Sequence, residues 1–216
     1  MPANEPQGLA IHYADDALLV LEKPAGLLSV PGLGPDKQDC LSARAQRHYA
    51  DALIVHRLDM ATSGLMLMAR GTGAQSTLSR YFAQRLVVKR YEAIVHGAVS
   101  APASTWDDID LPIAIDWPNR PRRVVAAQGG KPSHTRWRIT GRPNPTSTRL
   151  ELEPVTGRSH QLRVHLKAIG HPIIGDRLYA CCEPPTAARL LLHATQIAFA
   201  HPVTARAMRF SSTPDF

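Results

Sequence analysis

The stretch HRLDMATSGL, residues 56–65, combines a carboxylate, a guanidinium and two hydroxyls with a glycine. If residues 55–59 run extended, successive side chains point to opposite faces of the chain. Arg57 and Asp59 would then share one side and could act on one ligand, while His56 and Leu58 would point to the other. The alternative is structural: Asp59 would cap a turn and Arg57 would pair with it, as isolated charged residues usually do.

The residues that follow predict a turn and then a strand of the core. Thr62 and Ser63 have hydroxyls that are typical of turns, and Gly64 permits a positive φ. Residues 65–69 form an apolar run with the length of a buried strand. We therefore expect Asp59 at the mouth of a core strand.

The composition indicates a globular and basic chain. Of the 216 residues, 44% are hydrophobic and 20% are charged, which is enough for a large core in one domain or in two small lobes around a shared sheet. The net charge of +7 favours a polyanionic partner such as nucleic acid. The alternative is that this charge serves only solubility.

Cysteine usage and hydropathy predict a cytoplasmic protein. Cys181 and Cys182 are adjacent, Cys40 is far from both, and no CxxC pair occurs, so neither a disulfide framework nor a cysteine-rich zinc site is indicated. The first residues lack a cationic region followed by an apolar one, and no window approaches 18 uninterrupted apolar residues. We therefore expect a chain that is neither exported nor embedded in a membrane.

Hydrophobic periodicity predicts an α+β fold with a mainly antiparallel sheet. In addition to 65–69, strands are expected at residues 9–13, 17–22, 86–97, 134–140, 148–153, 190–200 and 207–211. Three helices are expected, with N-caps at Asp39, Thr72 and Ser159. Hairpins mixed with a few isolated helices argue against alternating βαβ units.

The helix expected at residues 160–169 should have one apolar stripe and one cationic face. The stripe would consist of Leu162, Leu166 and Ile169, and the cationic face of His160, Arg163 and Lys167. Another basic segment follows the Asp-rich residues 106–117, where the sequence DWPNRP at 116–121 is punctuated by proline. Together with Arg120, Arg122 and Arg123, it predicts a protruding basic hairpin or loop.

Several other chemistries have little support in the sequence. His160 and His165 are five residues apart, about 140° around a helix, so they cannot easily share a metal ion, and no HExxH or Cys/His cluster accompanies them. The segment GTGAQS at Gly71 matches GxGxxG only in part, and Lys131 lacks the upstream glycine of a P-loop. Ser63 is not in a GxSxG motif, which argues against a serine hydrolase.

Seven blocks, in order, resemble the RluA family of RNA pseudouridine synthases. They are KPAGLLSVPG at 23–32, HRLDMATSGL at 56–65, KRYEAIV at 89–95, DWPNRP at 116–121, GRSHQLRVH at 157–165, GHPIIGDRLY at 170–179 and RLLLHA at 189–194. The resemblance covers nearly the whole chain and implies the pseudouridine synthase catalytic fold, a bent mainly antiparallel mixed sheet with flanking helices and a central cleft. We expect residues 1–216 to form a single catalytic domain without an appended N-terminal RNA-binding domain.

The resemblance also assigns roles to individual residues. Asp59 of HRLD would be the catalytic carboxylate, acting as nucleophile at C1′ or as base at C2′ of the uridine. Arg158 would face it and favour its charged form, although Arg158 could instead grip a phosphate. Tyr91 would stack on the target base, and Leu192 would form a wall of its pocket; as bare sequence, Tyr91 reads as a core aromatic of a strand.

The remaining basic residues are candidates for RNA contacts. Arg57 could fill the gap that the flipped uridine leaves, because a guanidinium both stacks and donates hydrogen bonds. Phosphate contacts are expected from Lys89, Arg90, Arg120, Arg122, Arg123, Arg163 and Lys167, any of which could instead be a solvated surface charge. No cofactor or metal is expected, because the isomerisation needs no net oxidation, hydrolysis or energy.

The sequence therefore predicts an RNA pseudouridine synthase with two kinds of substrate. The block DWPNRP and the short chain resemble the family members that act on both ribosomal and transfer RNA, which implies stem-loops of 23S ribosomal RNA and of the transfer RNA anticodon arm as partners. We expect a monomer without a membrane partner. The alternative function is a non-catalytic basic RNA-binding or ribosome-assembly module that keeps the same fold.

Overall fold

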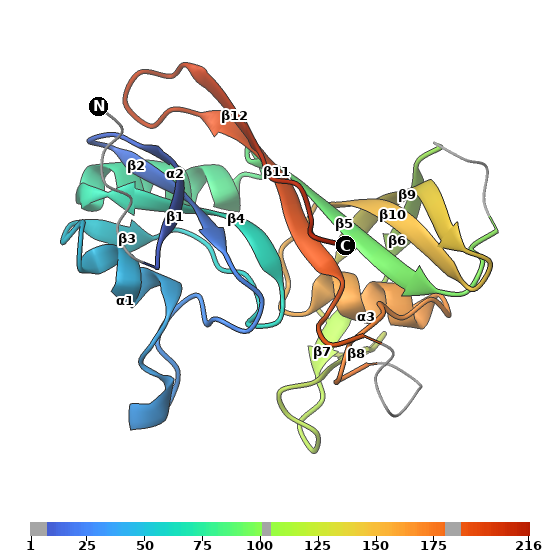
Figure 1. Ribbon diagram of the computed structural model, residues 1–216. Helices are drawn as coiled ribbons and strands as arrows, with labels where there is room; N and C mark the ends of the chain where they lie inside the picture. Colours follow the sequence, from blue (N-terminus) through green and yellow to red (C-terminus); the bar gives the residue numbers. More distant parts are fainter. Residues whose placement is uncertain (1–7, 101–104, 180–186) are drawn as a thin grey trace. The chain divides into compact units, whose positions relative to one another are not determined.

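The computed structural model describes residues 8–100, 105–179 and 187–216, and the chain divides into two compact units (Figure 1). Unit 1 contains residues 1–89 and 194–215, and unit 2 contains residues 90–193 and 216. Cys181 and Cys182 lie outside the described residues. Each unit is described separately below.

Unit 1 is built on a sheet in the order β1-β2-β4-β11, with β3 paired to β4 and β12 paired to β11. The pairs β1–β2, β2–β4, β3–β4 and β11–β12 are antiparallel. Its strands are β1 (Ala10–Ala14), β2 (Leu18–Lys23), β3 (Ala52–Ile54), β4 (Ser63–Arg70), β11 (Leu192–Ala200) and β12 (Ala207–Ser211), with the first two residues of β11 assigned to unit 2. Its helices are η1 (Pro35–Lys37), α1 (Leu41–Gln46) and α2 (Gly71–Ala83). The first hairpin is closed by the Asp15 carboxylate, which accepts hydrogen bonds from the backbone N–H groups of Ala17 and Leu18 at 2.8 and 2.9 Å.

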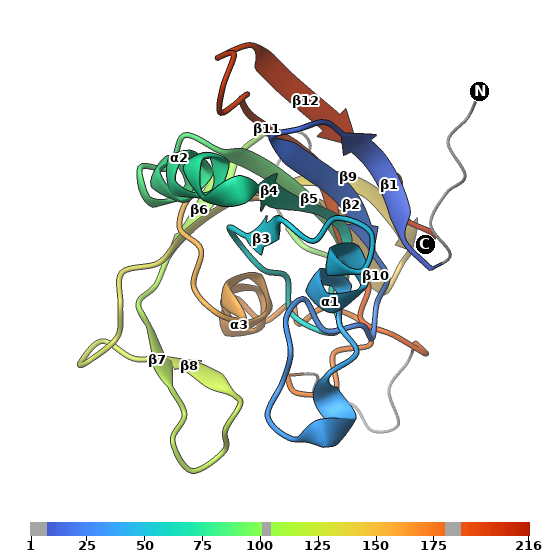
Figure 2. The same cartoon turned by 90° about the vertical axis from the view of Figure 1, so that its left-hand side faces the viewer.

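The core of unit 1 lies between this sheet and α2. Leu18 and Val20 of β2 and Leu65 and Leu67 of β4 are at most 1% exposed, and Leu78 of α2 packs into the same cluster. Figure 2 shows α2 lying along β4. Because most of β4 is buried on both faces, it reads as the continuous apolar run seen in the sequence.

Unit 2 has a second antiparallel set of strands in the order β5-β10-β9-β6, and a separate two-stranded hairpin of β7 and β8. The strands are β5 (Val88–His96), β6 (Asp107–Asp110), β7 (Ile113–Ile115), β8 (Arg123–Val125), β9 (His134–Asn144) and β10 (Ser147–Pro154), and the one helix of its described part is α3 (Gln161–Ala168). The predicted α+β class with mainly antiparallel pairing is therefore confirmed.

All three predicted helix caps are wrong. The N-cap of α1 is Cys40, whose Sγ accepts from Ala43 N at 3.4 Å, because the Asp39 carboxylate is engaged by Arg44 instead. Helix α2 begins at Gly71 after Arg70, without a side-chain cap. Helix α3 begins after His160, which has a left-handed backbone with φ 57°, rather than after Ser159.

The predicted cationic face of α3 also needs correction. Arg163 is only 4% exposed, and its Nε and Nη2 donate to the two carboxylate oxygens of Asp176 at 2.7 Å each. His165 is fully buried and neutral, since burial lowers its pKa; its Nε2 donates to Leu111 O, 2.9 Å away. The helix is thus buried on most sides, and Arg163 has a structural role inside unit 2.

Candidate active site

Asp59 lies in an irregular segment between β3 and β4 rather than on a strand. Strand β3 ends at Ile54, and a turn is closed where Thr62 N donates to Asp59 O at 3.0 Å. Arg57 is exposed, Leu58 is buried and Asp59 is half-buried, and residues 55–59 form no regular strand, so a shared side for Arg57 and Asp59 stays a prediction. The position of the Asp59 side chain therefore depends on the contacts that hold this loop.

The backbone on both sides of Asp59 is held by the loop that follows β2. Before it, the buried hydroxyl of Ser29 donates to Leu58 O at 2.7 Å and accepts from Leu58 N at 3.0 Å. After it, Met60 O accepts from Gly26 N at 2.8 Å and from Lys23 Nζ at 3.0 Å. These bonds hold the backbone of Leu58, immediately before Asp59, and of Met60, immediately after it.

Lys23 is a buried charged residue of unit 1 that contacts the Asp59 loop. Its side chain is 0% exposed, and its ammonium donates to three backbone carbonyls, those of Pro24, Leu27 and Met60, at 2.8 to 3.0 Å. Burial lowers its pKa to about 8, and the negative charge of Asp59 acts in the opposite direction. Lys23 therefore places a satisfied positive charge beside the loop that holds the carboxylate.

His56 ties the same segment to β4. Its Nε2 accepts from Leu67 N at 2.9 Å, and its ring stacks on Phe82 with centroids 4.6 Å apart. Burial, together with the charge of Lys89, lowers the pKa of His56 to about 3. The ring is therefore neutral, with its proton on Nδ1, and it acts as an acceptor that anchors the loop.

Gly64 is required by close packing as well as by its backbone angle. Its φ is 109°, as the sequence suggested, and a Cβ at this position would lie 2.4 Å from Ala194 O and 2.5 Å from Ala194 N on β11. Any side chain would therefore force β4 and β11 apart at the point where β4 leaves the Asp59 loop.

The other predicted catalytic residues belong to unit 2. Tyr91 is half-buried on β5, in register with Leu152 of β10, and Leu192 is 3% exposed. Arg158 is exposed just before α3, where its N donates to Gln161 Oε1 at 2.9 Å and its Nε donates to Pro132 O at 3.3 Å. Asp59 and Arg57 belong to unit 1, so the pairing of Asp59 with Arg158 stays a prediction.

The predicted phosphate-binding residues fall into exposed and engaged groups. Exposed side chains are Arg120, Arg122 and Lys167, and half-buried ones are Lys89, Arg90 and Arg123. Arg90 forms ion pairs with Glu151 and Glu153, and its guanidinium lies 4.7 Å from the ring centroid of Trp106. Burial lowers the pKa of Lys89. Arg163, buried against Asp176, cannot offer its guanidinium to a phosphate.

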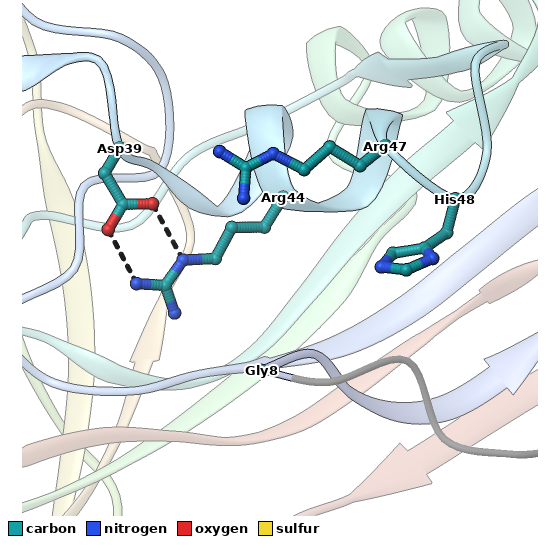
Figure 3. A pocket seen from close by; sticks show the side chains of 5 residues that line it. All are labelled: Gly8, Asp39, Arg44, Arg47 and His48. Carbon is teal, nitrogen blue, oxygen red and sulfur yellow. Dashed lines mark hydrogen bonds and ion pairs between the residues drawn. The ribbon is translucent and has the colours of Figure 1, made fainter.

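Sequence reasoning missed a basic cavity in unit 1. It has a volume of about 530 Å³ and is lined by Gly8, Asp39, Arg44, Arg47 and His48 (Figure 3). Arg44 forms two hydrogen bonds with Asp39, at 2.6 and 2.8 Å, and this pairing lowers the pKa of Asp39, to which the charge of Arg47 adds. The paired charges of Asp39 and Arg44 leave Arg47 to give the lining a net positive charge, which suits a phosphate.

Ser29 and Lys23 were also missed as individual residues, although the block KPAGLLSVPG was noted. Within residues 8–100, 105–179 and 187–216, no group of three or more His, Cys, Asp or Glu side chains could hold a metal ion. The same part of the chain has no helix that is long and apolar enough to cross a membrane.

Comparisons with known proteins show the family of this chain. The model of the family described as RNA pseudouridylate synthase matches residues 17–168. The dual-specificity RNA pseudouridine synthase RluA of Escherichia coli (strain K12) is 45% identical over 216 residues, covering 100% of this chain and 97% of that protein. The protein of the same name from Pasteurella multocida (strain Pm70) is 43% identical over 219 residues, with the same coverage.

Solved structures show the same fold. The human RNA pseudouridylate synthase domain containing 1 has a TM-score of 0.79 and 25% identity, covering 100% of this chain and 87% of that one. The human RNA pseudouridylate synthase domain containing 4 has a TM-score of 0.73 and 24% identity, covering 95% and 89%. The fold that the sequence resemblance implied is therefore confirmed. On the family match and the full-length identity, this chain belongs to the RluA family of RNA pseudouridine synthases.

Proposed function

We propose that this protein isomerises specific uridines to pseudouridine in stem-loops of 23S ribosomal RNA and of the transfer RNA anticodon arm, with Asp59 as the catalytic carboxylate. The observation that carries the proposal is the double support of the Asp59 backbone, by Ser29 at Leu58 and by Lys23 at Met60. A carboxylate that must meet one atom of a flipped nucleotide needs a fixed position, since small displacements cost large factors in rate.

The chemistry assigned to these residues requires one ionised carboxylate. The N1–C1′ bond breaks, the uracil turns within the pocket, C5 forms a bond with C1′, and the hydrogen on C5 leaves as a proton. Asp59 acts as nucleophile at C1′ or as base at C2′. In this proposal Arg158 pairs with Asp59, Tyr91 stacks on the base, and Leu192 closes the apolar side of the pocket.

RNA binding is proposed for the exposed basic side chains. Arg57 is exposed two residues before Asp59 and would fill the space that the flipped uridine leaves. The exposed Arg120, Arg122 and Lys167 would contact phosphates, together with the half-buried Arg123. Arg47 and His48 in the basic cavity of unit 1 join this set, because a net positive lining attracts the RNA backbone.

The wider proposal is a single catalytic domain that acts as a cytoplasmic monomer, without a cofactor. The relatives named dual-specificity RNA pseudouridine synthase support two kinds of RNA substrate. A non-catalytic assembly module is disfavoured, because such a protein would have no need of a supported carboxylate in the HRLD loop.

The deciding experiment measures tritium release from RNA labelled at uridine C5, because the new carbon–carbon bond expels that hydrogen. The wild-type protein should release tritium from an anticodon stem-loop and from a short 23S ribosomal RNA hairpin. Asp59→Asn should abolish release while binding stays within a few fold, because phosphate contacts dominate affinity. Retained turnover in Asp59→Asn would remove Asp59 from the chemistry, and modification of assembled ribosomal particles alone would overturn recognition of isolated stem-loops.

A further inference from the structure

The loop between β7 and β8 presents an aromatic side chain to solvent. Trp117 is 64% exposed, although tryptophan is among the largest apolar side chains. The guanidinium carbon of Arg120 lies 4.8 Å from the centroid of its ring, a cation–π arrangement. Figure 2 shows that this loop projects beyond β7 and β8.

The loop is ordered by its own hydrogen bonds rather than by burial of Trp117. The Asp116 carboxylate accepts from the backbone N–H of Asn119 at 3.3 Å and from its side-chain amide at 3.1 Å. Backbone bonds join Asp116 N to Arg122 O at 3.2 Å and Arg122 N to Asn119 O at 3.0 Å. The base of the hairpin is fixed where Arg123 N donates to the hydroxyl of Tyr179 at 2.7 Å. The loop that carries Trp117 is therefore ordered while the Trp117 side chain stays exposed.

Trp106 provides an instructive contrast within unit 2. Arg90, Arg136 and Arg138 surround its ring at 4.7 to 5.0 Å, but Glu151 and Glu153 pair with those arginines and Trp106 is half-buried. That cluster is neutralised and belongs to the surface of the sheet. Trp117 and Arg120 are both exposed, and among the described residues no ion pair joins the Arg120 guanidinium to a carboxylate.

We infer that Trp117 and Arg120 form a stacking site for an unpaired base of the RNA substrate, next to the loop that contains the target uridine. This inference rests on the proposed function and adds a second point of recognition to it. Aromatic rings and guanidinium planes bind unpaired bases by stacking, whereas the bases inside a double helix are already stacked on both faces. Arg120 thereby has a second role besides phosphate contact: it orients the indole and reinforces the stack with its charge.

The test measures binding without turnover, on the Asp59→Asn background. Two RNAs are compared, a stem-loop with an unpaired loop and a blunt duplex with the same stem sequence. In the Trp106→Phe variant, tryptophan fluorescence should be quenched by the stem-loop and much less by the duplex. In the Trp117→Phe variant, which retains Trp106 and the buried Trp137, the quenching by the stem-loop should largely disappear.

Affinity gives the second readout. Trp117→Ala should weaken binding of the stem-loop about tenfold and binding of the duplex less than twofold. Trp106→Ala is the matched control and should not distinguish the two RNAs. Arg120→Lys keeps the charge but removes the planar group, so it should weaken the stem-loop more than the duplex.

Two results would overturn the inference: equal quenching in Trp106→Phe and Trp117→Phe, or equal weakening of both RNAs by Trp117→Ala. The first result would mean that Trp117 does not contact this RNA, and the second would mean that Trp117 contacts RNA without selecting unpaired bases. Tritium release by the wild-type protein is measured in parallel, so that failure of the stacking site and failure of the isomerase proposal are distinguished.

Discussion

The hydroxyl of Ser29 forms two hydrogen bonds with the backbone of Leu58, the residue immediately before Asp59. A single buried side chain thus holds both backbone polar groups of the residue that precedes the proposed catalytic carboxylate.

Ser29→Ala should lower kcat for tritium release about tenfold or more and leave KM nearly unchanged, because the loop that positions Asp59 loses its support while RNA contacts remain. The free energy of unfolding should fall by about 1–3 kcal/mol, since Leu58 N and Leu58 O lose a buried partner. Ser42→Ala is the matched control, a buried serine of α1 whose hydroxyl faces Cys40, and it should keep kcat. An unchanged kcat in Ser29→Ala would remove this positioning role.

Lys23 should make both stability and activity depend on alkaline pH. Its pKa is about 8 in the folded protein, below its ordinary value of 10.5, so between these values the unfolded chain binds more protons. The free energy of unfolding contributed by this group therefore rises with pH from about 8 to 10.5. Over the same range kcat should fall, because a neutral amine no longer places a positive charge beside the Asp59 loop.

Urea denaturation and initial rates between pH 7 and 9.5 check this prediction. Lys23→Met has similar length and no charge, so the alkaline rise in stability and the fall of kcat near pH 8 should both disappear, with kcat low throughout. A fall that persists in Lys23→Met would belong to another group or to the RNA.

His56 should make unit 1 sensitive to acid. Its pKa is about 3 in the folded protein, below the ordinary 6.5, so stability from this group is present above pH 6.5 and is lost as pH falls toward 3. The slope is up to about 1.4 kcal/mol per pH unit, because the unfolded chain takes up a proton that the folded one excludes. Thermal unfolding of wild type, His56→Gln and the exposed-site control His48→Gln from pH 4 to 7 should show a reduced slope in His56→Gln alone.

The substitutions Arg163→Ala and Arg122→Ala should have different effects, because Arg163 has a structural role and Arg122 is proposed to bind RNA. Arg163→Ala leaves the buried Asp176 carboxylate without its partner and should cost about 3–5 kcal/mol of folding free energy. Arg122→Ala should leave the melting temperature unchanged and reduce the slope of log Kd against log salt by roughly 0.7 to 0.9, the value for one phosphate contact. A normal salt slope in Arg122→Ala would exclude this residue from the interface.

The sequence predicted the strands well, because their signal is local. The apolar run at residues 65–69 became the buried centre of β4, and the expected strand at residues 207–211 is β12 at the same bounds. The helix caps failed because a capping side chain can be engaged elsewhere: the Asp39 carboxylate binds Arg44 five residues away.

The candidate site was predictable only in part, for a similar reason. A motif identifies Asp59, but the groups that hold its loop depend on contacts distant in sequence. Lys23 in a Pro-Gly-rich segment reads as a solvated lysine, and its burial requires the carbonyl of Met60. A helical wheel places Arg163 on an exposed face, because it does not include the contact with Asp176, which lies beyond the helix in the sequence.

The discontinuity of unit 1 affects how the protein is made. Strand β4 is synthesised long before β11, because the whole of unit 2 lies between them in the sequence. Until β11 emerges from the ribosome, β4 has β2 on one side of Gly64 but no strand on the other, and unpaired edges of this kind promote association between incomplete chains. The end of the Asp59 loop at Gly64 thus gains its close contact with Ala194 only late in translation, after the bonds to Lys23 and Ser29 can already have formed.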